Sequence, residues 1–235
     1  MSFVSMLKTS VQRLNNLFFP RLCEVCESAL VEGEDVLCTA CNIDLPRTDF
    51  HLQADNRMER LFWGQCKLER STAWFFYHKG SPFLRPIHRF KYNGRKEVAF
   101  QLGRLCATEL VADDFFAGID LLIPIPLHPR RQRRRGYNQS MYIAQGVSQA
   151  TGIPVAADVL VRIRDGESQT EKPAYERRSD MQGSFALKQA TPIVGRHLLL
   201  IDDVLTTGTT ATACIQALKE AEGVRISVLT LCLAD

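Results

Sequence analysis

The chain has 235 residues, of which 46% are hydrophobic and 23% are charged, and this balance excludes a wholly disordered chain and permits a packed core. The formal net charge is +3, but five arginines between residues 130 and 135 supply more than this excess, so the basic character is local. No apolar run approaches the roughly 18 residues of a membrane span, which excludes a membrane-inserted class of protein.

The first 17 residues have apolar side chains at helical spacing, and they predict an amphipathic helix. Lys8 and Arg13 interrupt the apolar positions, so the segment is not typical of a secretory signal peptide. Without an export signal, we expect a cytoplasmic protein.

Four cysteines follow this helix as two pairs with C-x2-C spacing: Cys23, Cys26, Cys38 and Cys41. Four thiolates at this spacing can surround one Zn²⁺ in a tetrahedron, and four protein ligands leave no open position, so the metal is expected to be structural. The alternatives are two disulfides or reduced structural cysteines, and the expected cytoplasmic location disfavours disulfides.

Three zones are predicted along the chain: residues 1–50 with the helix and the zinc-binding module, a polar connector over 51–70, and an α/β domain over 71–235. Short apolar strands that alternate with helices predict an α/β fold with a mostly parallel sheet. The expected strands are 72–77, 120–126, 198–202 and 226–232, and the expected helices are 95–112, 137–150 and 209–222. The polar stretch 164–184 is interpreted as a mobile loop over a site or, alternatively, as an ordinary surface loop.

The segment 198–213 (LLLIDDVLTTGTTATA) predicts a strand, a loop and a helix start. Unpaired amides at the helix start, a glycine that lets the backbone approach closely and several hydroxyls suit a phosphate monoester: Thr206, Thr207, Gly208, Thr209 and Thr210. Asp202 and Asp203 would repel phosphate but can accept from sugar hydroxyls or bind Mg²⁺. Together they predict a ribose 5-phosphate site. A plain threonine-capped helix is the alternative.

The stretch 124–140 (PIPLHPRRQRRRGYNQS) follows a predicted strand and carries the arginine run. We expect a loop that leads into a helix near Tyr137. Arginine forks bind pyrophosphate oxygens in pairs, and Arg135 is the best candidate. A solvated basic loop is one alternative, and single-stranded DNA tracked by Arg130–Arg134 with Tyr137 as a stacking surface is another.

The residues 199–210 resemble the phosphoribosyl-pyrophosphate (PRPP) motif of type I phosphoribosyltransferases. The double C-x2-C, the stretch 124–140 and the pattern of Gln169, Glu176 and Arg177 extend the resemblance, over roughly residues 20 to 235, to the ComF (competence protein F-like) family. The resemblance implies a type I phosphoribosyltransferase fold, PRPP and Mg²⁺ as ligands, pyrophosphate bound by part of 127–136, and a mobile loop over the site with Gln169, Arg177 and Arg178.

For function, the resemblance implies a phosphoribosyltransferase with Asp202 and Asp203 as catalytic residues and an unknown acceptor, acting in DNA uptake during natural transformation. DNA-uptake machinery proteins are then possible partners. The alternative is a PRPP-sensing or single-stranded-DNA-binding competence factor without turnover, because a fold alone does not prove catalysis.

Overall fold

A computed structural model describes residues 20–164 and 183–234 of the chain. Two compact units can be separated, Met1–Leu45 and Pro46–Asp235, and each is described by itself. The amphipathic helix expected in the first 17 residues lies outside the described part. Among the described residues, no helix combines the length and the apolar character that crossing a membrane requires.

The first unit is built from turns and one short helix, α2 (Thr39–Ile43). A backbone hydrogen bond of 3.0 Å from Glu24 to Val36 and an isolated bridge between Leu22 and Ala29 hold its loops together. Its few buried apolar side chains are insufficient for a large core, so cross-linking of some kind is expected to stabilise it.

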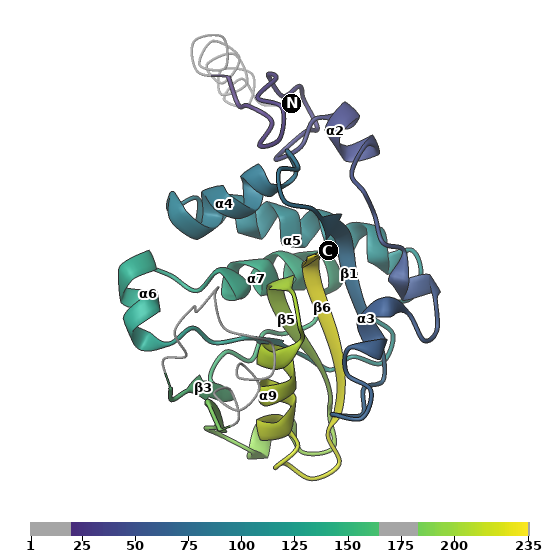
Figure 1. Ribbon diagram of the computed structural model, residues 1–235, viewed down its shortest axis with the longest axis vertical. Coiled ribbons are helices and arrows are strands. Elements are labelled where there is room, and N and C mark those ends of the chain that lie inside the picture. Colours follow the sequence, from purple (N-terminus) through teal and green to yellow (C-terminus); the bar gives the residue numbers. More distant parts are fainter. Residues whose placement is uncertain (1–19, 165–182, 235) are drawn as a thin grey trace, which may run out of the picture. The chain divides into compact units, whose positions relative to one another are not determined.

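The second unit contains a four-stranded parallel sheet in the order β1-β6-β5-β2, which confirms the α/β fold class (Figure 1). All four expected strands are present, as β1 (Ser71–Tyr77), β2 (Leu121–Pro124), β5 (His197–Leu205) and β6 (Arg225–Ala234). The expected end of β5 was too early. Its last residues remain paired with β6, so Asp202 and Asp203 lie within the strand and not after it.

Helices cover both faces of the sheet (Figure 1). On one face, α5 (Lys96–Val111) and α7 (Gln139–Thr151) pack closely against each other, because Gly103 and Gly146 have no side chain to separate their backbones. On the other face, α9 (Thr209–Leu218) buries its apolar side against Leu198 and Leu200 of β5. These three helices confirm the sequence prediction, apart from their end residues.

Several elements were not predicted from the sequence. Residues 51–70, expected to be a polar connector, contain a helix that begins after an Asn56 cap, and Met58 and Phe62 from this segment are buried in the core of the second unit. The further elements are η1 (Phe50–Leu52), α3 (Arg57–Arg60), α4 (Leu84–Tyr92), α6 (Pro129–Arg135), the antiparallel pair β3 (Leu160–Arg162) and β4 (Phe185–Leu187), and η2 (Thr191–Ile193).

The arginine run is a helix and not the expected loop. Pro129 occupies the first turn of α6, where its missing N–H costs nothing, and the His128 side chain accepts from the Arg130 amide at 3.3 Å. Gly136 ends the helix with a left-handed φ of 86°, and a new helix, α7, begins after Asn138. Two capped helices, the short α6 and the longer α7, therefore follow β2 in place of one loop and one helix.

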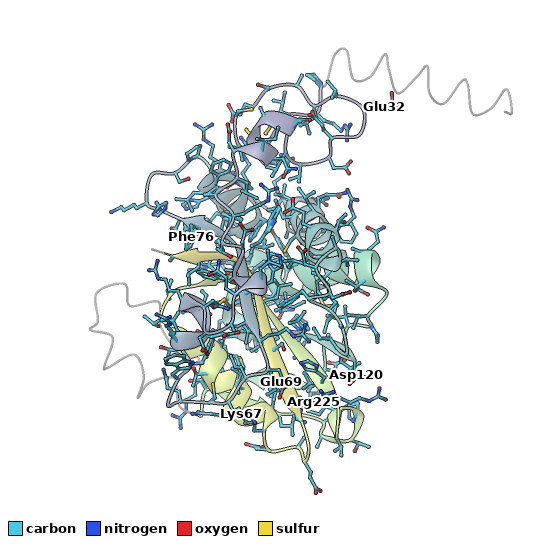
Figure 2. The ribbon with its side chains drawn as sticks, turned by 90° about the vertical axis from the view of Figure 1, so that its right-hand side faces the viewer. Glu32, Lys67, Glu69, Phe76, Asp120 and Arg225 are labelled. Atoms are coloured by element: carbon cyan, nitrogen blue, oxygen red, sulfur yellow. The ribbon has the colours of Figure 1, made fainter. Side chains whose placement is uncertain are left out.

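All four strands run in the same direction, so their carboxyl ends lie at one edge of the sheet. Figure 2 shows Glu69 and Arg225, which precede or begin strands, at one end of the sheet, and Phe76, near the end of β1, toward the other. The segments that follow β2 and β5 start from the carboxyl edge, where parallel α/β sheets bind their ligands.

Candidate functional site

The loop after β5 leads into α9 through Gly208, which has a φ of 75°. The Gly208 carbonyl accepts from the Thr212 amide at 2.8 Å, and the hydroxyls of Thr207 and Thr209 lie 2.8 Å apart. In the described part of the chain, no group accepts from the amides of Thr209 and Thr210. Thr206 is exposed and the other threonines are half-buried. The helix start therefore has unused donors and positive potential.

The Phe62 ring lies next to Gly208 and supports this loop. A Cβ built on Gly208 would lie 3.5 Å from the Phe62 ring, which is ordinary contact, but the left-handed backbone still favours glycine. Phe62 is 1% exposed. The loop is thus braced by a residue of the segment that the sequence suggested was a connector, and no sequence signal pointed to that role.

Asp202 lies at the end of β5 next to the start of α7. Its Oδ1 accepts from the Ser140 hydroxyl at 3.0 Å and from the Asp203 amide at 2.9 Å. Burial, and then the charge of Asp203, raise the pKa of the Asp202 carboxyl to about 7 in spite of these hydrogen bonds and the charge of Lys91. The group is therefore poised to change protonation near neutral pH.

Asp203 has a different partner, the ammonium of Lys91 at the end of α4. Lys91 Nζ lies 3.1 Å from Asp203 Oδ1, while Oδ2 is buried and has no hydrogen-bond partner among the described residues. Burial lowers the pKa of Lys91, but the charges of Asp203 and Asp202 outweigh it, so that the pKa is raised. Sequence reasoning missed Lys91, because one lysine on a basic helix carries no signal of its own.

Lys91 also borders a cationic cleft between the end of α4 and α6. The cleft has a volume of about 160 Å³ and is lined by Lys91, Tyr92, Gly94, Arg131, Arg134 and Arg135. The Arg135 guanidinium donates to the Gln139 side chain and lies 5.8 Å from the centroid of the Tyr92 ring. No side chain of α6 is buried. The arrangement suits an anion with several oxygens.

Tyr137 does not have the role that the DNA hypothesis gave it. Its side chain is buried, and its hydroxyl donates to the Phe90 carbonyl, so it is not available to stack on a base. The exposed aromatic residue beside the arginines is Tyr92, which is 69% exposed. The loop candidates Gln169, Arg177 and Arg178 lie outside the described residues.

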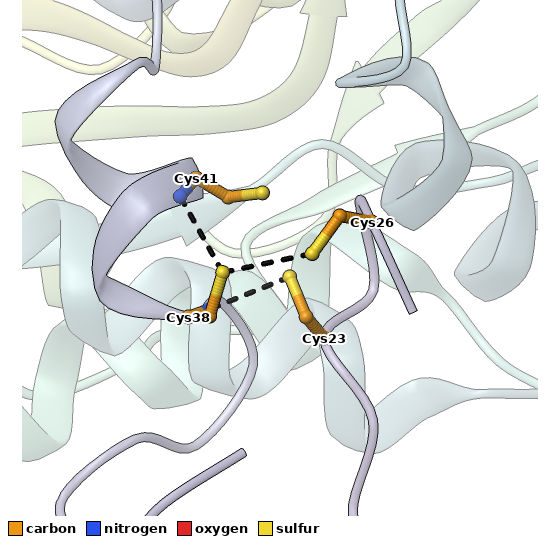
Figure 3. A group of neighbouring side chains, drawn as sticks. All are labelled: Cys23, Cys26, Cys38 and Cys41. Carbon is orange, nitrogen blue, oxygen red and sulfur yellow. Dashed lines mark hydrogen bonds between the residues drawn. The ribbon is translucent and has the colours of Figure 1, made fainter. Parts of the chain in front are cut away.

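The two cysteine pairs of the first unit converge, as Figure 3 shows. The four sulfur atoms of Cys23, Cys26, Cys38 and Cys41 all lie within 4.8 Å of one another and can hold a metal ion. Amides of Cys38 and Cys41 donate to the sulfurs of Cys23 and Cys38 at 3.3 and 3.5 Å. All four are free cysteines, so no disulfide joins them in the structure.

The thiols of the cluster differ in pKa. Burial, and then hydrogen bonds with the neighbouring cysteines, raise the pKa of the Cys41 thiol, and the pKa of Cys38 is also raised. Cys26 is shifted the other way. Hydrogen bonds from Ser28, first from its hydroxyl, lower the pKa of the Cys26 thiol to about 6. Cys26 therefore has substantial thiolate character at neutral pH even before a cation adds its own charge.

The raised pKa of Asp202 predicts a pH-dependent stability. Between pH 4 and 7 the folded chain holds a proton on Asp202 that the unfolded chain has lost, so unfolding becomes easier as the pH rises through this window. Asp202→Asn keeps the acceptor oxygen and removes the charge. We expect the variant to gain about 2 kcal/mol or more over wild type between pH 4 and pH 8 in urea unfolding. Asp158→Asn, at an exposed ion pair, serves as control, and a pH-independent difference for Asp202→Asn contradicts the expectation.

Curated relatives match nearly the whole chain. The DNA utilization protein YhgH of Shigella flexneri is 31% identical over 218 residues, which cover 90% of this chain and 89% of the relative. The competence protein ComFC of Bacillus subtilis is 30% identical and the competence protein F of Haemophilus influenzae is 27% identical, with 90% and 86% of this chain and 83% and 93% of those proteins covered. No family model matches the chain.

Solved structures resemble part of the chain. Glutamine PRPP amidotransferase from B. subtilis aligns with 60% of this chain and 30% of its own, with a TM-score of 0.39 and 18% identity. An adenine phosphoribosyltransferase aligns with 63% of this chain and 75% of its own, with a TM-score of 0.39 and 14% identity. The sequence relatives, which extend across both units, decide the family: the chain belongs to the ComF family, together with the competence protein F and YhgH proteins.

Proposed function

We propose that this chain binds PRPP with Mg²⁺ at the carboxyl edge of the sheet and acts as a phosphoribosyltransferase whose acceptor is not identified. The observation that carries the proposal is the succession of a half-buried and a buried acid, a glycine loop and a helix start with unused amides along Asp202–Thr210. Each part matches one part of a ribose 5-phosphate, and the order along the chain matches the order along the sugar.

The 5-phosphate is assigned to the start of α9. Amides of Thr209 and Thr210 are available there, and the half-buried threonine hydroxyls add donors to the same place. Phe62 supports Gly208 and so holds the loop in the shape that presents these amides. A preformed set of donors binds an anion without first breaking protein hydrogen bonds.

The ribose hydroxyls are assigned to the acid pair. Ser140 fixes one oxygen of Asp202, and Lys91 fixes one oxygen of Asp203, which leaves the other oxygens as acceptors. Mg²⁺, when bound, neutralises charge on the pyrophosphate and ribose oxygens. Asp202 has a pKa of about 7, so it loses its proton most readily when a cation approaches.

Transfer requires that the bond between C1 and the pyrophosphate oxygen breaks, and the electron pair leaves with pyrophosphate. Positive charge then develops on the ribose ring, where Asp202 stabilises it, and the lone pair of an acceptor forms the new bond to C1. Arg135 and its neighbours on α6 are assigned to the departing pyrophosphate, since guanidinium groups bind its oxygens in pairs.

The names of the relatives indicate a process for this chemistry. Proteins called DNA utilization protein and competence protein cover nearly the whole chain, and we assign this chain a role in DNA uptake in natural transformation, in the cytoplasm. Proteins of the uptake machinery and single-stranded DNA are the corresponding partners.

The acid pair provides a direct test of PRPP binding. The double variant Asp202→Asn, Asp203→Asn removes both charges while keeping the shape of the side chains, and we expect PRPP affinity to fall at least 100-fold in a calorimetric titration with Mg²⁺. Asp158→Asn, an exposed site elsewhere, should bind as wild type does. Unchanged affinity in a folded double variant refutes the assignment. Pyrophosphate release from PRPP with a panel of bases then separates an enzyme from a sensor.

The second candidate function is binding of single-stranded DNA without turnover, and the exposed Tyr92 beside the arginine helix favours it. Replacing four arginines by alanine (Arg130, Arg131, Arg133 and Arg134) should weaken binding and reduce the salt dependence by about 0.7 per lost contact. Tyr92→Ala should weaken binding further, by about 1–3 kcal/mol per base, whereas Tyr92→Phe keeps the stacking surface. If wild-type protein does not bind single-stranded DNA at low salt, this candidate function is refuted.

We assign Zn²⁺ to the four-cysteine cluster of the first unit. Tetrahedral thiolate sites select zinc, and the metal can supply on the order of 10 kcal/mol of folding free energy to so small a unit. Elemental analysis should find one zinc per chain. Cys38→Ser should lose it, while Cys66→Ser, at a cysteine outside the cluster, should retain it. Full retention of zinc by Cys38→Ser contradicts the assignment.

A further inference from the structure

Lys91 and Asp203 form a buried ion pair that is only partly satisfied. The Lys91 side chain is 20% exposed and that of Asp203 is 6% exposed. An ammonium has three N–H donors, and Asp203 Oδ1 is the acceptor for one of them; the described residues supply no other. On the other side of the pair, Asp203 Oδ2 also has no partner within residues 20–164 and 183–234. The described residues therefore leave two donors of Lys91 and one acceptor of Asp203 without a protein partner.

Such a pair is costly to bury, because each charge loses its hydration and regains only part of it from the protein. Incomplete hydrogen bonding of buried charges in a folded protein is typical of a site that a ligand completes. A ligand reaches Lys91 from its exposed side, because 20% of the side chain remains accessible.

Lys91 lines the cationic cleft. Lys91 lies in the cleft lining with Arg131, Arg134 and Arg135, and it is the member that is bonded to the acid pair. No carboxylate of the described residues pairs with Arg134 or Arg135. The charged groups facing Lys91 are thus Asp203 and Asp202 on the strand side and the arginines on the α6 side.

Resting on the function proposed above, we infer that Lys91 is a further ligand of the pyrophosphate leaving group, placed there by Asp203. When the bond from C1 to the pyrophosphate oxygen breaks, that oxygen gains the electron pair. One unused N–H group of Lys91 donates to it, and the other donates to a further pyrophosphate oxygen. The lysine keeps its proton throughout, so no acid or base is required for the departure. Asp203 acts through Lys91 as a positioning residue, in addition to any contact of its second oxygen.

The test compares three ligands on the full chain: inorganic pyrophosphate, ribose 5-phosphate and PRPP, each titrated with Mg²⁺ by calorimetry. Lys91→Met should bind pyrophosphate and PRPP at least 10-fold more weakly and ribose 5-phosphate within twofold of wild type. Lys91→Arg, which keeps the charge, should recover most of the lost affinity for pyrophosphate. Lys188→Met removes an exposed lysine on another part of the same unit and should leave all three affinities unchanged.

The outcomes separate this inference from the proposed function. Wild-type protein that binds pyrophosphate through Lys91 but neither ribose 5-phosphate nor PRPP supports the role of Lys91 and overturns the proposed function. The inference is overturned if Lys91→Met binds pyrophosphate as tightly as wild type does. It is also overturned if Lys91→Met loses affinity equally for all three ligands, because an equal loss indicates a structural role for Lys91.

Folding of the variant is controlled separately. Lys91→Met leaves Asp203 buried without its partner, and the variant can fail to fold for that reason. The double variant Lys91→Met, Asp203→Asn removes both charges together. In this double variant, loss of pyrophosphate binding with a cooperative urea unfolding transition retained supports the inference, and retained pyrophosphate binding overturns it.

Discussion

Two negative charges on adjacent residues of a buried strand are the constraint on which the carboxyl edge of the sheet depends. Neither carboxylate can be left there without compensation, because burial penalises the charged form and each raises the cost of the other. Each acid has a different partner: the Ser140 hydroxyl of α7 donates to Asp202, and the Lys91 ammonium of α4 pairs with Asp203. The helices α4 and α7 are in this way tied to β5.

Much of this arrangement could be predicted from the sequence. The period and length of the apolar runs predict the four strands and the three long helices. A parallel sheet is buried on both faces, so its strands appear in the sequence as continuous apolar runs. The strand, loop and helix around Gly208 could be predicted for the same reason, and so could the four-cysteine cluster, whose geometry follows from the spacing of its two pairs.

Other parts could not be predicted, for identifiable reasons. The arginine helix has no buried side chain, so it has no apolar period, and only its caps Pro129 and Gly136 give its ends. Lys91 and Ser140 reach Asp202 and Asp203 across long stretches of chain, and no local pattern encodes such tertiary contacts. Residues 51–60 look polar in sequence, yet Met58, together with Phe62 just after this stretch, enters the core. A short amphipathic turn is below the length at which periodicity is informative.

The lack of buried side chains in α6 has a consequence for how this helix is held. Moving it uncovers no core surface, so the hydrophobic effect does not resist its displacement. Its position is instead set by its two ends and by Arg135, which donates to Gln139 and lies over the Tyr92 ring. Such polar contacts respond to ionic strength and to bound anions more than core packing does, so these conditions act most strongly on this arginine-rich helix.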